Sequence, residues 1–169
     1  PIIRIQDPNM RSRMLNHVLA QILIYQLKLT EYNKAQQKNI WLDERHTSLN
    51  KDLTIGVLGV GYLGKFIANK LKSLNYNVIG YKNTISAAKY SIPIYYKKSL
   101  KTFLKLSDII VSVLPATKET RDLINKSFLN QMKKKSLLIN IGRGSSLNEM
   151  DLLKHIKQNN YFFASLDVF

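Results

Sequence analysis

The sequence has 169 residues, a length typical of one domain, and hydrophobic residues make up 45% of it, enough to bury a core. It contains no cysteine, which excludes disulfides, thiolate metal sites and a cysteine nucleophile. The formal net charge of +15 comes mainly from lysines spread along the chain, which favours a solvated lysine-rich surface over the alternative, a functional basic patch for nucleic acid.

The sequence gives no sign of membrane insertion or secretion. No apolar run reaches the roughly 18 residues that a transmembrane helix needs, so no membrane partner is expected. The first residues lack the basic and apolar regions of a signal peptide. Because nothing requires an oxidising compartment, we expect a cytoplasmic protein. The sequence does not begin with methionine, and we expect it to start within a longer protein.

The first 52 residues divide into a short linker, a long helix and a polar arm. Residues 1–8 contain an apolar run closed by Asp7 and Pro8, which reads as the end of a strand or a linker. Residues 10–37 repeat apolar side chains at spacings of three and four, which predicts one long helix. Residues 38–52 are polar apart from a short segment around Trp41 and are typical of a connecting arm.

From residue 54 onward, strands alternate with helices in most units. The expected strands are 54–58, 77–81, 92–96, 108–114, 136–141 and 162–168. The expected helices are 62–74, 99–106 with Ser99 as N-cap, 125–133, and 148–158 with a capping box from Asn148 and Asp151. Near-continuous apolar strands that alternate with helices predict an α/β fold, a doubly wound parallel sheet with helices on both faces.

A glycine-rich loop joins the first strand of this pattern to the first helix. The residues are Gly59, Val60, Gly61, Tyr62, Leu63 and Gly64, and a second strand follows about 20 residues on, as the dinucleotide-binding motif requires. The first glycine permits a tight turn, the second a close approach to a pyrophosphate, and the third close packing of helix on strand. We therefore expect residues 9–169 to form a dinucleotide-binding domain.

The end of the second strand indicates which dinucleotide is preferred. Enzymes that use NAD usually carry Asp or Glu there to accept a hydrogen bond from the ribose 2′-hydroxyl. This sequence has no acid between residues 74 and 84, and Lys82 stands at the expected position. A cation can neutralise a 2′-phosphate, so we expect NADP(H) to be preferred over NAD(H). The alternative is that Lys82 is an ordinary surface lysine.

Residues 107–169 resemble the D-isomer-specific 2-hydroxyacid dehydrogenases in both motif order and spacing. Within that family, the long first helix with Tyr32, Gln36, Gln37 and Trp41 is most similar to the glyoxylate/hydroxypyruvate reductase branch. The matching segments are Leu114-Pro115, Glu119-Thr120-Arg121, Leu123-Ile124-Asn125, Met132-Lys133, Ile139-Asn140, Arg143-Gly144 and Leu166-Asp167-Val168-Phe169. The resemblance implies that residues 1–8 are a remnant of, or a linker from, a missing substrate domain.

The resemblance also assigns roles around a bound dinucleotide. The pyrophosphate would be held by Gly59, Gly61, Tyr62, Leu63 and Gly64, and the cofactor cleft would be lined by Leu114 and Pro115, with Thr120 nearby. Ile141 and Gly142 would lie near the nicotinamide ribose, and Asp167 would accept from the carboxamide. The family usually has a different small residue at position 142, so we expect Gly142 to loosen its loop. No metal is expected.

Arg143 matches the catalytic, substrate-binding arginine of the family. A 2-oxoacid presents a carboxylate and a ketone oxygen on adjacent carbons, and a permanently charged guanidinium can bind both. The same charge stabilises the alkoxide that develops during hydride transfer. The resemblance thus implies NADPH-dependent reduction of a small 2-oxoacid, such as glyoxylate or hydroxypyruvate, to the 2-hydroxyacid.

The family's general acid, a histidine held by a glutamate, has no match in this sequence. His17, His46 and His155 stand at other positions, so we expect the chain to be inactive alone. Two alternatives stay open: a free-standing NADP sensor or corepressor-like domain, and a non-functional remnant. In the family, the region matching residues 10–50 helps to pair two nucleotide-binding domains, so we expect a homodimer through these residues.

Overall fold

The computed structural model describes residues 7–43, 47–85 and 88–169. The strands are β1 (Thr54–Leu58), β2 (Asn77–Lys82), β3 (Ile94–Tyr96), β4 (Ile109–Ser112), β5 (Ser136–Asn140) and β6 (Phe162–Leu166). The α-helices are α1 (Pro8–Gln26), α2 (Leu29–Gln37), α3 (Tyr62–Ser73), α4 (Leu100–Leu106), α5 (Lys126–Leu129) and α6 (Glu149–Gln158). Three short 3₁₀ turns cover Asn50–Asp52, Lys97–Ser99 and Gly144–Ser146.

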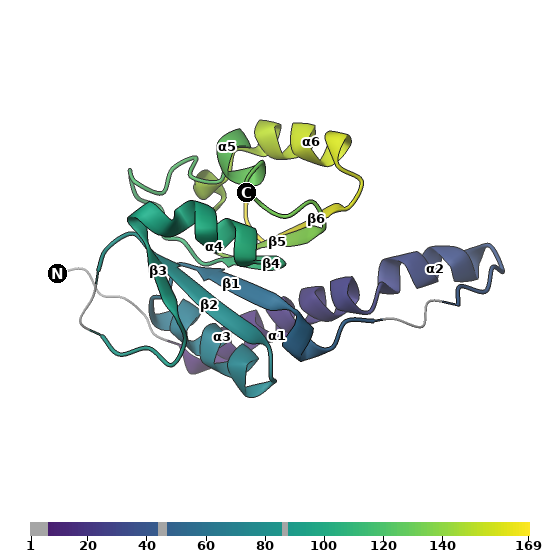
Figure 1. Ribbon diagram of the computed structural model, residues 1–169, viewed down its shortest axis with the longest axis horizontal. Helices are drawn as coiled ribbons and strands as arrows, with labels where there is room; N and C mark the ends of the chain where they lie inside the picture. The colour runs from purple at the N-terminus through teal and green to yellow at the C-terminus, as the bar shows by residue number, and fades with distance from the viewer. Residues whose placement is uncertain (1–6, 44–46, 86–87) are drawn as a thin grey trace.

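The strands form one sheet in the order β3-β2-β1-β4-β5-β6, and every pairing is parallel. The chain builds the sheet outward from β1 in one direction, then crosses back to add β4, β5 and β6 on the other side (Figure 1). The point where the direction changes lies between β1 and β4. This confirms the predicted doubly wound α/β fold, in which ligands bind where the strand order reverses.

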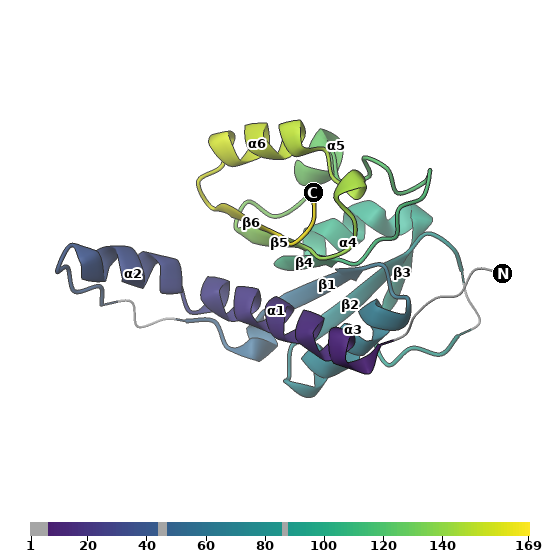
Figure 2. The same ribbon diagram turned by 180° about the vertical axis from the view of Figure 1, so that it is seen from behind.

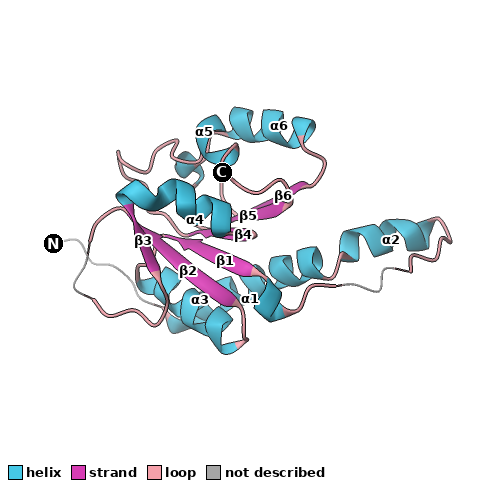
Figure 3. Ribbon diagram, in the orientation of Figure 1, coloured by secondary structure: helices cyan, strands magenta, loops and turns pink. Residues whose placement is uncertain are grey.

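Helices cover both faces of the sheet because the central strands are apolar on both sides. One core lies between the sheet and helices α1 and α3, and includes Val18, Ile22, Ile55, Val57, Ile67 and Leu71. The other lies under α4, α5 and α6, and includes Leu58, Phe103, Ile110, Leu129, Leu138 and Leu152. Figure 3 shows the helices arranged on both sides of the strands. Burial on two faces explains why the strands read as nearly continuous apolar runs.

The prediction of one helix over residues 10–37 is wrong, because the chain breaks into α1 and α2. Lys28 adopts a left-handed conformation (φ 52°) between them, at the N-cap of α2. The last residue of α1, Gln26, is buried. Its side-chain NH₂ group donates to the Ser48 carbonyl oxygen at 2.8 Å, and its side-chain oxygen accepts from the Tyr76 hydroxyl at 2.7 Å. These contacts join the end of α1 to the returning arm, and α2 projects beyond the sheet (Figure 2).

Four other predicted elements are shorter in the structure by two residues or more. The strands expected over residues 92–96 and 162–168 cover only Ile94–Tyr96 and Phe162–Leu166. The strand expected over residues 108–114 pairs only from Ile109 to Ser112, because the chain then turns away at the switch point. The helix expected over 125–133 ends at Leu129. Beyond it, the amides of Gln131 and Met132 bond three residues back instead of four, which makes turns of the following residues.

The helices expected to start at Ser99 and Asn148 do start there, but their capping hydrogen bonds differ from those predicted. Ser99 precedes α4, yet its side chain makes no capping hydrogen bond. Asn148 caps α6 by accepting from the Asp151 backbone amide at 3.0 Å, which is half of the expected capping box. The Asp151 carboxylate accepts instead from the Lys126 backbone amide at 2.9 Å, so it links α6 to the start of α5.

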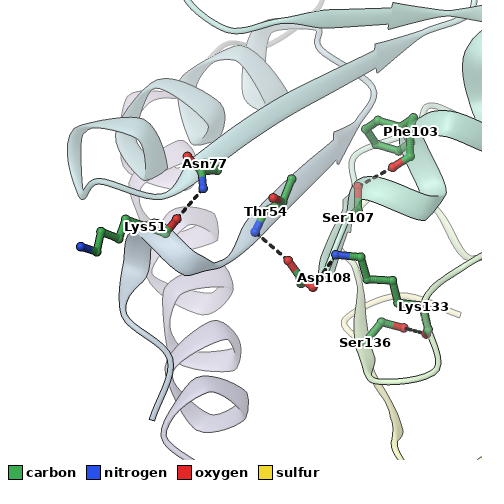
Figure 4. Close-up of polar contacts among 8 residues, drawn as sticks. All are labelled: Lys51, Thr54, Asn77, Phe103, Ser107, Asp108, Lys133 and Ser136. Carbon is green, nitrogen blue, oxygen red and sulfur yellow. Dashed lines mark hydrogen bonds and ion pairs between the residues drawn. The ribbon is translucent and has the colours of Figure 1, made fainter. Parts of the chain in front are cut away.

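At the N-terminal edge of the sheet, Asp108 links three elements (Figure 4). Its carboxylate accepts from the Thr54 backbone amide at 2.9 Å and from the Lys133 ammonium at 2.7 Å. It thereby joins the start of β1 to the segment before β5. This edge lies opposite the edge where ligands bind in such sheets.

Among the described residues, no helix is long and apolar enough to cross a membrane, and no group of three acidic or histidine side chains could hold a metal ion. The apolar run expected near the start lies within residues 1–6, which are outside the described ranges. Asp7 and Pro8, expected to close a strand or linker, are instead the N-cap and the first residue of α1.

Candidate functional site

The residues expected to bind the cofactor and the substrate lie at the C-terminal ends of parallel strands or in the loops that follow them, so the fold brings them to one edge of the sheet. The glycine loop follows β1, Lys82 ends β2, and the other segments follow β4, β5 and β6. Backbone hydrogen bonds continue past the strand ends and hold these loops together. In each of these bonds a backbone amide donates to a backbone carbonyl oxygen. The amide and carbonyl residues are Gly59 and Tyr81 (3.0 Å), Val113 and Leu58 (2.8 Å), Ile141 and Ser112 (3.1 Å), and Asp167 and Asn140 (3.0 Å).

The three loop glycines have different surroundings. Gly59 has φ +101°, and a Cβ there would lie 3.0 Å from the Val113 carbonyl oxygen. A Cβ on Gly64 would collide with the Gly59 carbonyl oxygen, so helix and loop can approach this closely only without a side chain. A Cβ on Gly61 would meet no atom within 4 Å. The space beside Gly61 is therefore open, as a ligand-accepting loop requires.

The start of α3 presents backbone donors to that space. Gly61 is the N-cap and has no side chain to accept a hydrogen bond from these amides. The Lys65 amide donates to the Gly61 carbonyl oxygen at 2.9 Å, which is the first hydrogen bond of the helix. The amides of the first turn of a helix lack intrahelical partners, and the helix dipole adds partial positive charge there. The glycine loop thus fits the pyrophosphate of a dinucleotide.

Lys82 makes contacts that its sequence position did not predict. Its ammonium donates to the Tyr90 hydroxyl at 2.7 Å and lies 5.2 Å from the centroid of the Tyr90 ring. The Lys65 ammonium, from the first turn of α3, lies 5.7 Å from the same centroid. Sequence reasoning missed Lys65 and Tyr90. Only the position of Lys65 directly after Gly64 could have drawn attention to it.

The loop after β4 forms the opposite wall of the switch point. Leu114 is buried, and Pro115 begins a turn closed by Thr120. The Thr120 hydroxyl donates to the Pro115 carbonyl oxygen and accepts from the Thr117 amide at 2.9 Å. Thr120 therefore holds the shape of this loop through its own side chain.

The loop after β5 carries Arg143 and is packed more tightly than expected. A Cβ on Gly142 would lie 2.7 Å from both the amide nitrogen and the carbonyl oxygen of Leu114, so the expected loosening at Gly142 is wrong. Buried Ile141 precedes it. Arg143 is exposed, and its guanidinium donates to the Gly142 carbonyl oxygen at 2.8 Å, which leaves further N–H donors for a ligand.

Asp167 and the first turn of α1 complete this edge. The backbone amide of Asp167 continues the sheet ladder while its carboxylate is exposed.

The Arg11 guanidinium lies 4.1 Å from the Phe66 ring centroid and 5.2 Å from that of Tyr62, and donates to the Tyr62 hydroxyl at 3.2 Å. Arg11 therefore adds a positive charge beside the glycine loop that sequence reasoning did not identify.

Among the described residues, no hydrogen bond or ring contact joins a histidine to Arg143. His155 on α6 packs edge-on against Phe162, the first residue of β6, with ring centroids 4.7 Å apart. That contact is at the opposite edge of the sheet, and burial lowers the pKa of His155. His17 lies mid-way along α1, and its Nε2 is buried without a hydrogen-bond partner. His46 falls outside the described residues.

Comparison with known proteins identifies similar chains. Residues 19–169 match the family model described as D-isomer specific 2-hydroxyacid dehydrogenase, NAD binding domain. The chain is 34% identical over its full length to a glyoxylate/hydroxypyruvate reductase A from Photorhabdus laumondii, of which it covers 54%. The chain therefore spans about half the length of the curated relatives that it matches.

Solved structures agree with this match. A D-isomer specific 2-hydroxyacid dehydrogenase from Xanthobacter autotrophicus Py2, in complex with NADPH, superimposes with a TM-score of 0.92 at 31% identity, covering all of this chain and 69% of that one. An NADPH-dependent glyoxylate/hydroxypyruvate reductase from Sinorhizobium meliloti, in complex with NADP and sulfate, gives a TM-score of 0.92 at 30% identity and 54% coverage of its own chain.

The glycine geometry predicts opposite effects at two positions of one loop. Gly64→Ala should lower the free energy of unfolding by about 1–3 kcal/mol, because the new methyl group meets backbone that cannot move aside. Gly61→Ala should leave it nearly unchanged, since its φ of −85° suits alanine and the space is open. Urea denaturation of both variants measures this. Equal stability of the two variants would contradict the close approach of α3 to the loop.

Proposed function

The chain belongs to the NAD-binding domain family of the D-isomer-specific 2-hydroxyacid dehydrogenases, and from that membership we propose that it binds NADP(H) and takes part in reducing a small 2-oxoacid to the 2-hydroxyacid. The substrate class, of the glyoxylate or hydroxypyruvate type, is supported by the names of the similar reductases. Residues 9–169 act in this proposal as one dinucleotide-binding domain, with residues 9–52 as its helical arm.

One observation carries the proposal: the glycine loop and Arg143 lie at the same edge of the sheet, on either side of the switch point. The loop after β1 offers an open anion-binding turn, and the loop after β5 offers a guanidinium with spare donors. The residues between them, including Leu114 and Ile141, are apolar and buried. A dinucleotide laid across this edge would have its pyrophosphate on α3 and its nicotinamide toward Arg143.

The preference for NADP(H) rests on Lys82. A carboxylate at the end of β2 would repel a 2′-phosphate, whereas the ammonium of Lys82 attracts it and can donate hydrogen bonds. Similar structures from Xanthobacter autotrophicus and Sinorhizobium meliloti contain NADPH or NADP, which supports the same choice for this chain.

Lys82→Asp should weaken NADPH binding about ten- to a hundred-fold, the range expected for a charge-assisted hydrogen bond, and should affect NADH much less. Calorimetric titration of both cofactors measures the two dissociation constants. Lys101→Asp, an exposed substitution on α4 with the same charge change, serves as the control and should leave the ratio unchanged. An NADPH-to-NADH ratio that is the same in wild type and Lys82→Asp would reject this role.

Arg143 is the residue proposed to orient the substrate. Bound NADPH supplies the hydride in this chemistry. The guanidinium would bind the substrate carboxylate and ketone oxygen together, which fixes the carbonyl carbon at the nicotinamide, and would stabilise negative charge on that oxygen as it develops. Thr120 would hold the loop after β4 in place, and Gly142 and Asp167 would contact the ribose and carboxamide of the nicotinamide half.

The proton for the reduced oxygen requires a general acid, which typically contributes ~10²–10⁴-fold. Neither His17 nor His155, the histidines within the described residues, makes a hydrogen bond or ring contact with Arg143. We therefore propose that these 169 residues alone turn over slowly, because they lack the rate enhancement that a general acid beside Arg143 would give.

Arg143→Gln should lower kcat about 10²–10³-fold, in these 169 residues and in any longer gene product that contains them, by removing the charge that stabilises the developing alkoxide. Arg143→Lys keeps the charge but loses the two-pronged geometry, so it should recover only part of the activity. NADPH oxidation with glyoxylate and with hydroxypyruvate measures both. The control is Arg121→Gln, an exposed arginine on the neighbouring loop. Unchanged kcat in Arg143→Gln would instead favour a domain that only senses NADP.

We also propose that the chain forms a homodimer through residues 10–50, in the cytoplasm. The exposed side chains of Leu23, Ile24, Leu27 and Leu29 form an apolar face on α1 and α2. A groove of about 770 Å³ runs between these helices and the edge strand β6, where Phe163 is partly exposed. Burial in this groove, with the nearby carboxylates of Asp108 and Glu31, raises the pKa of Tyr25 to about 12. An exposed apolar face of this kind favours association.

Ile24→Lys should shift the protein from dimer to monomer, because it places a charge in the middle of the proposed interface. Met150→Lys, at a more exposed methionine on α6, should not affect association. Sedimentation equilibrium at tens of micromolar distinguishes the two states. A wild-type protein that is monomeric at that concentration, without aggregation, would refute the proposed interface.

A further inference from the structure

We propose that Lys65 and Tyr90 join Lys82 in a clamp for the 2′-phosphate of NADP(H). In this clamp Lys65 supplies a second positive charge and Tyr90 is a positioning residue. The inference rests on the proposed binding of a dinucleotide and adds to it two residues that determine which dinucleotide is preferred. The three residues come from different elements: the first turn of α3, the segment before β3, and the end of β2.

The Tyr90 ring brings the two ammonium groups onto one small patch. Lys82 donates to its hydroxyl at 2.7 Å and lies 5.2 Å from the ring centroid. Lys65 lies 5.7 Å from the same centroid, a distance at which a cation is attracted to the face of an aromatic ring. The hydroxyl fixes one lysine and the ring attracts the other, so Tyr90 positions both charges.

The segment that carries Tyr90 is itself anchored to α3 and β2. The Lys65 ammonium donates to the Lys89 carbonyl oxygen at 3.5 Å, and the Ser91 hydroxyl donates to the Asn69 side chain at 2.7 Å. The Gly80 amide donates to the Pro93 carbonyl oxygen at 2.9 Å. Tyr90 is therefore held over α3 before any ligand binds, which reduces the entropy cost of assembling the clamp.

The patch is positively charged, and its two ammonium groups have no carboxylate partner in the described part of the chain. Among the described residues, no carboxylate forms an ion pair with Lys65 or Lys82. Two ammonium groups near one another repel, and a bound anion removes that repulsion. Each ammonium has three N–H donors, so Lys82 keeps two after bonding Tyr90. The group that would bind here is a doubly charged phosphate.

The position of the patch identifies which phosphate that is. β2 pairs directly with β1, and the Gly59 amide, at the start of the glycine loop, donates to the Tyr81 carbonyl oxygen next to Lys82. The clamp therefore lies beside the proposed pyrophosphate site, on the side of β2. In a doubly wound sheet the adenosine ribose lies on that side, and its 2′-position faces the end of β2.

The test compares ligands that differ only in the 2′-phosphate. Calorimetric titrations of NADPH against NADH, and of 2′,5′-ADP against 5′-AMP, are made with wild type, Lys65→Gln, Tyr90→Phe and the control Lys70→Gln. Lys70 lies further along α3 and its ammonium is 6.0 Å from the Phe66 ring centroid, so it shares the helix but not the patch.

Lys65→Gln should weaken NADPH and 2′,5′-ADP about ten- to a hundred-fold and leave NADH and 5′-AMP unchanged. Tyr90→Phe keeps the ring and loses the bond to Lys82, so it should weaken the same two ligands by a smaller factor, about two- to tenfold. Melting temperatures of all variants check that the fold is intact. A merely structural Tyr90 would change the melting temperature and leave the ligand ratios alone.

Two kinds of failure can be told apart. If wild type binds neither NADPH nor NADH, the proposed function fails and the clamp fails with it. If wild type binds both but Lys65→Gln weakens them equally, or Lys70→Gln acts as strongly as Lys65→Gln, only the clamp is overturned. Inorganic phosphate binding more tightly than 2′,5′-ADP would assign the patch to a free phosphate and would also overturn it.

Discussion

The close approach of backbones where β1, β4 and β5 leave the sheet is the constraint on which the rest of the structure depends. A side chain at Gly64 would strike the Gly59 carbonyl, and one at Gly142 would strike the Leu114 backbone. These contacts bring the start of α3 and the loop that carries Arg143 to the same switch point. The proposed pyrophosphate site and Arg143 are positioned by these two glycine contacts.

The two edges of the sheet have different roles because all strands run in one direction. At the N-terminal edge, side chains satisfy the backbone internally, as Asp108 does for Thr54 while pairing with Lys133. At the C-terminal edge, donors are left over: the first turn of α3, the guanidinium of Arg143 and the ammonium groups near Tyr90. These spare donors make the C-terminal edge attractive to an anionic ligand.

Part of the positive charge of the chain lies at the C-terminal edge of the sheet, where the ligand is proposed to bind. The net charge of +15 is spread widely, yet cations also lie at specific places along the proposed cleft. Lys82 and Lys65 meet at Tyr90 on the side of β2, and Arg143 stands beyond β5. A dinucleotide with its phosphates on the side of β2, together with a 2-oxoacid bound at Arg143, would complement this distribution of charge.

The sequence by itself determined the sheet, the glycine loop and the identity of Lys82 and Arg143 as candidates, because each depends on neighbours within one short segment. Apolar strand, turn and helix are contiguous around Gly59, so their period could be read directly. The tertiary structure decided what depends on distant partners. The helix predicted over residues 10–37 breaks because Gln26 bonds Ser48 and Tyr76, and Lys65 meets Tyr90 only because the segment before β3 folds back over α3. Hydrogen bonds and charge contacts between residues that are 20 to 50 positions apart leave no periodic pattern in a sequence, so only the fold could reveal them.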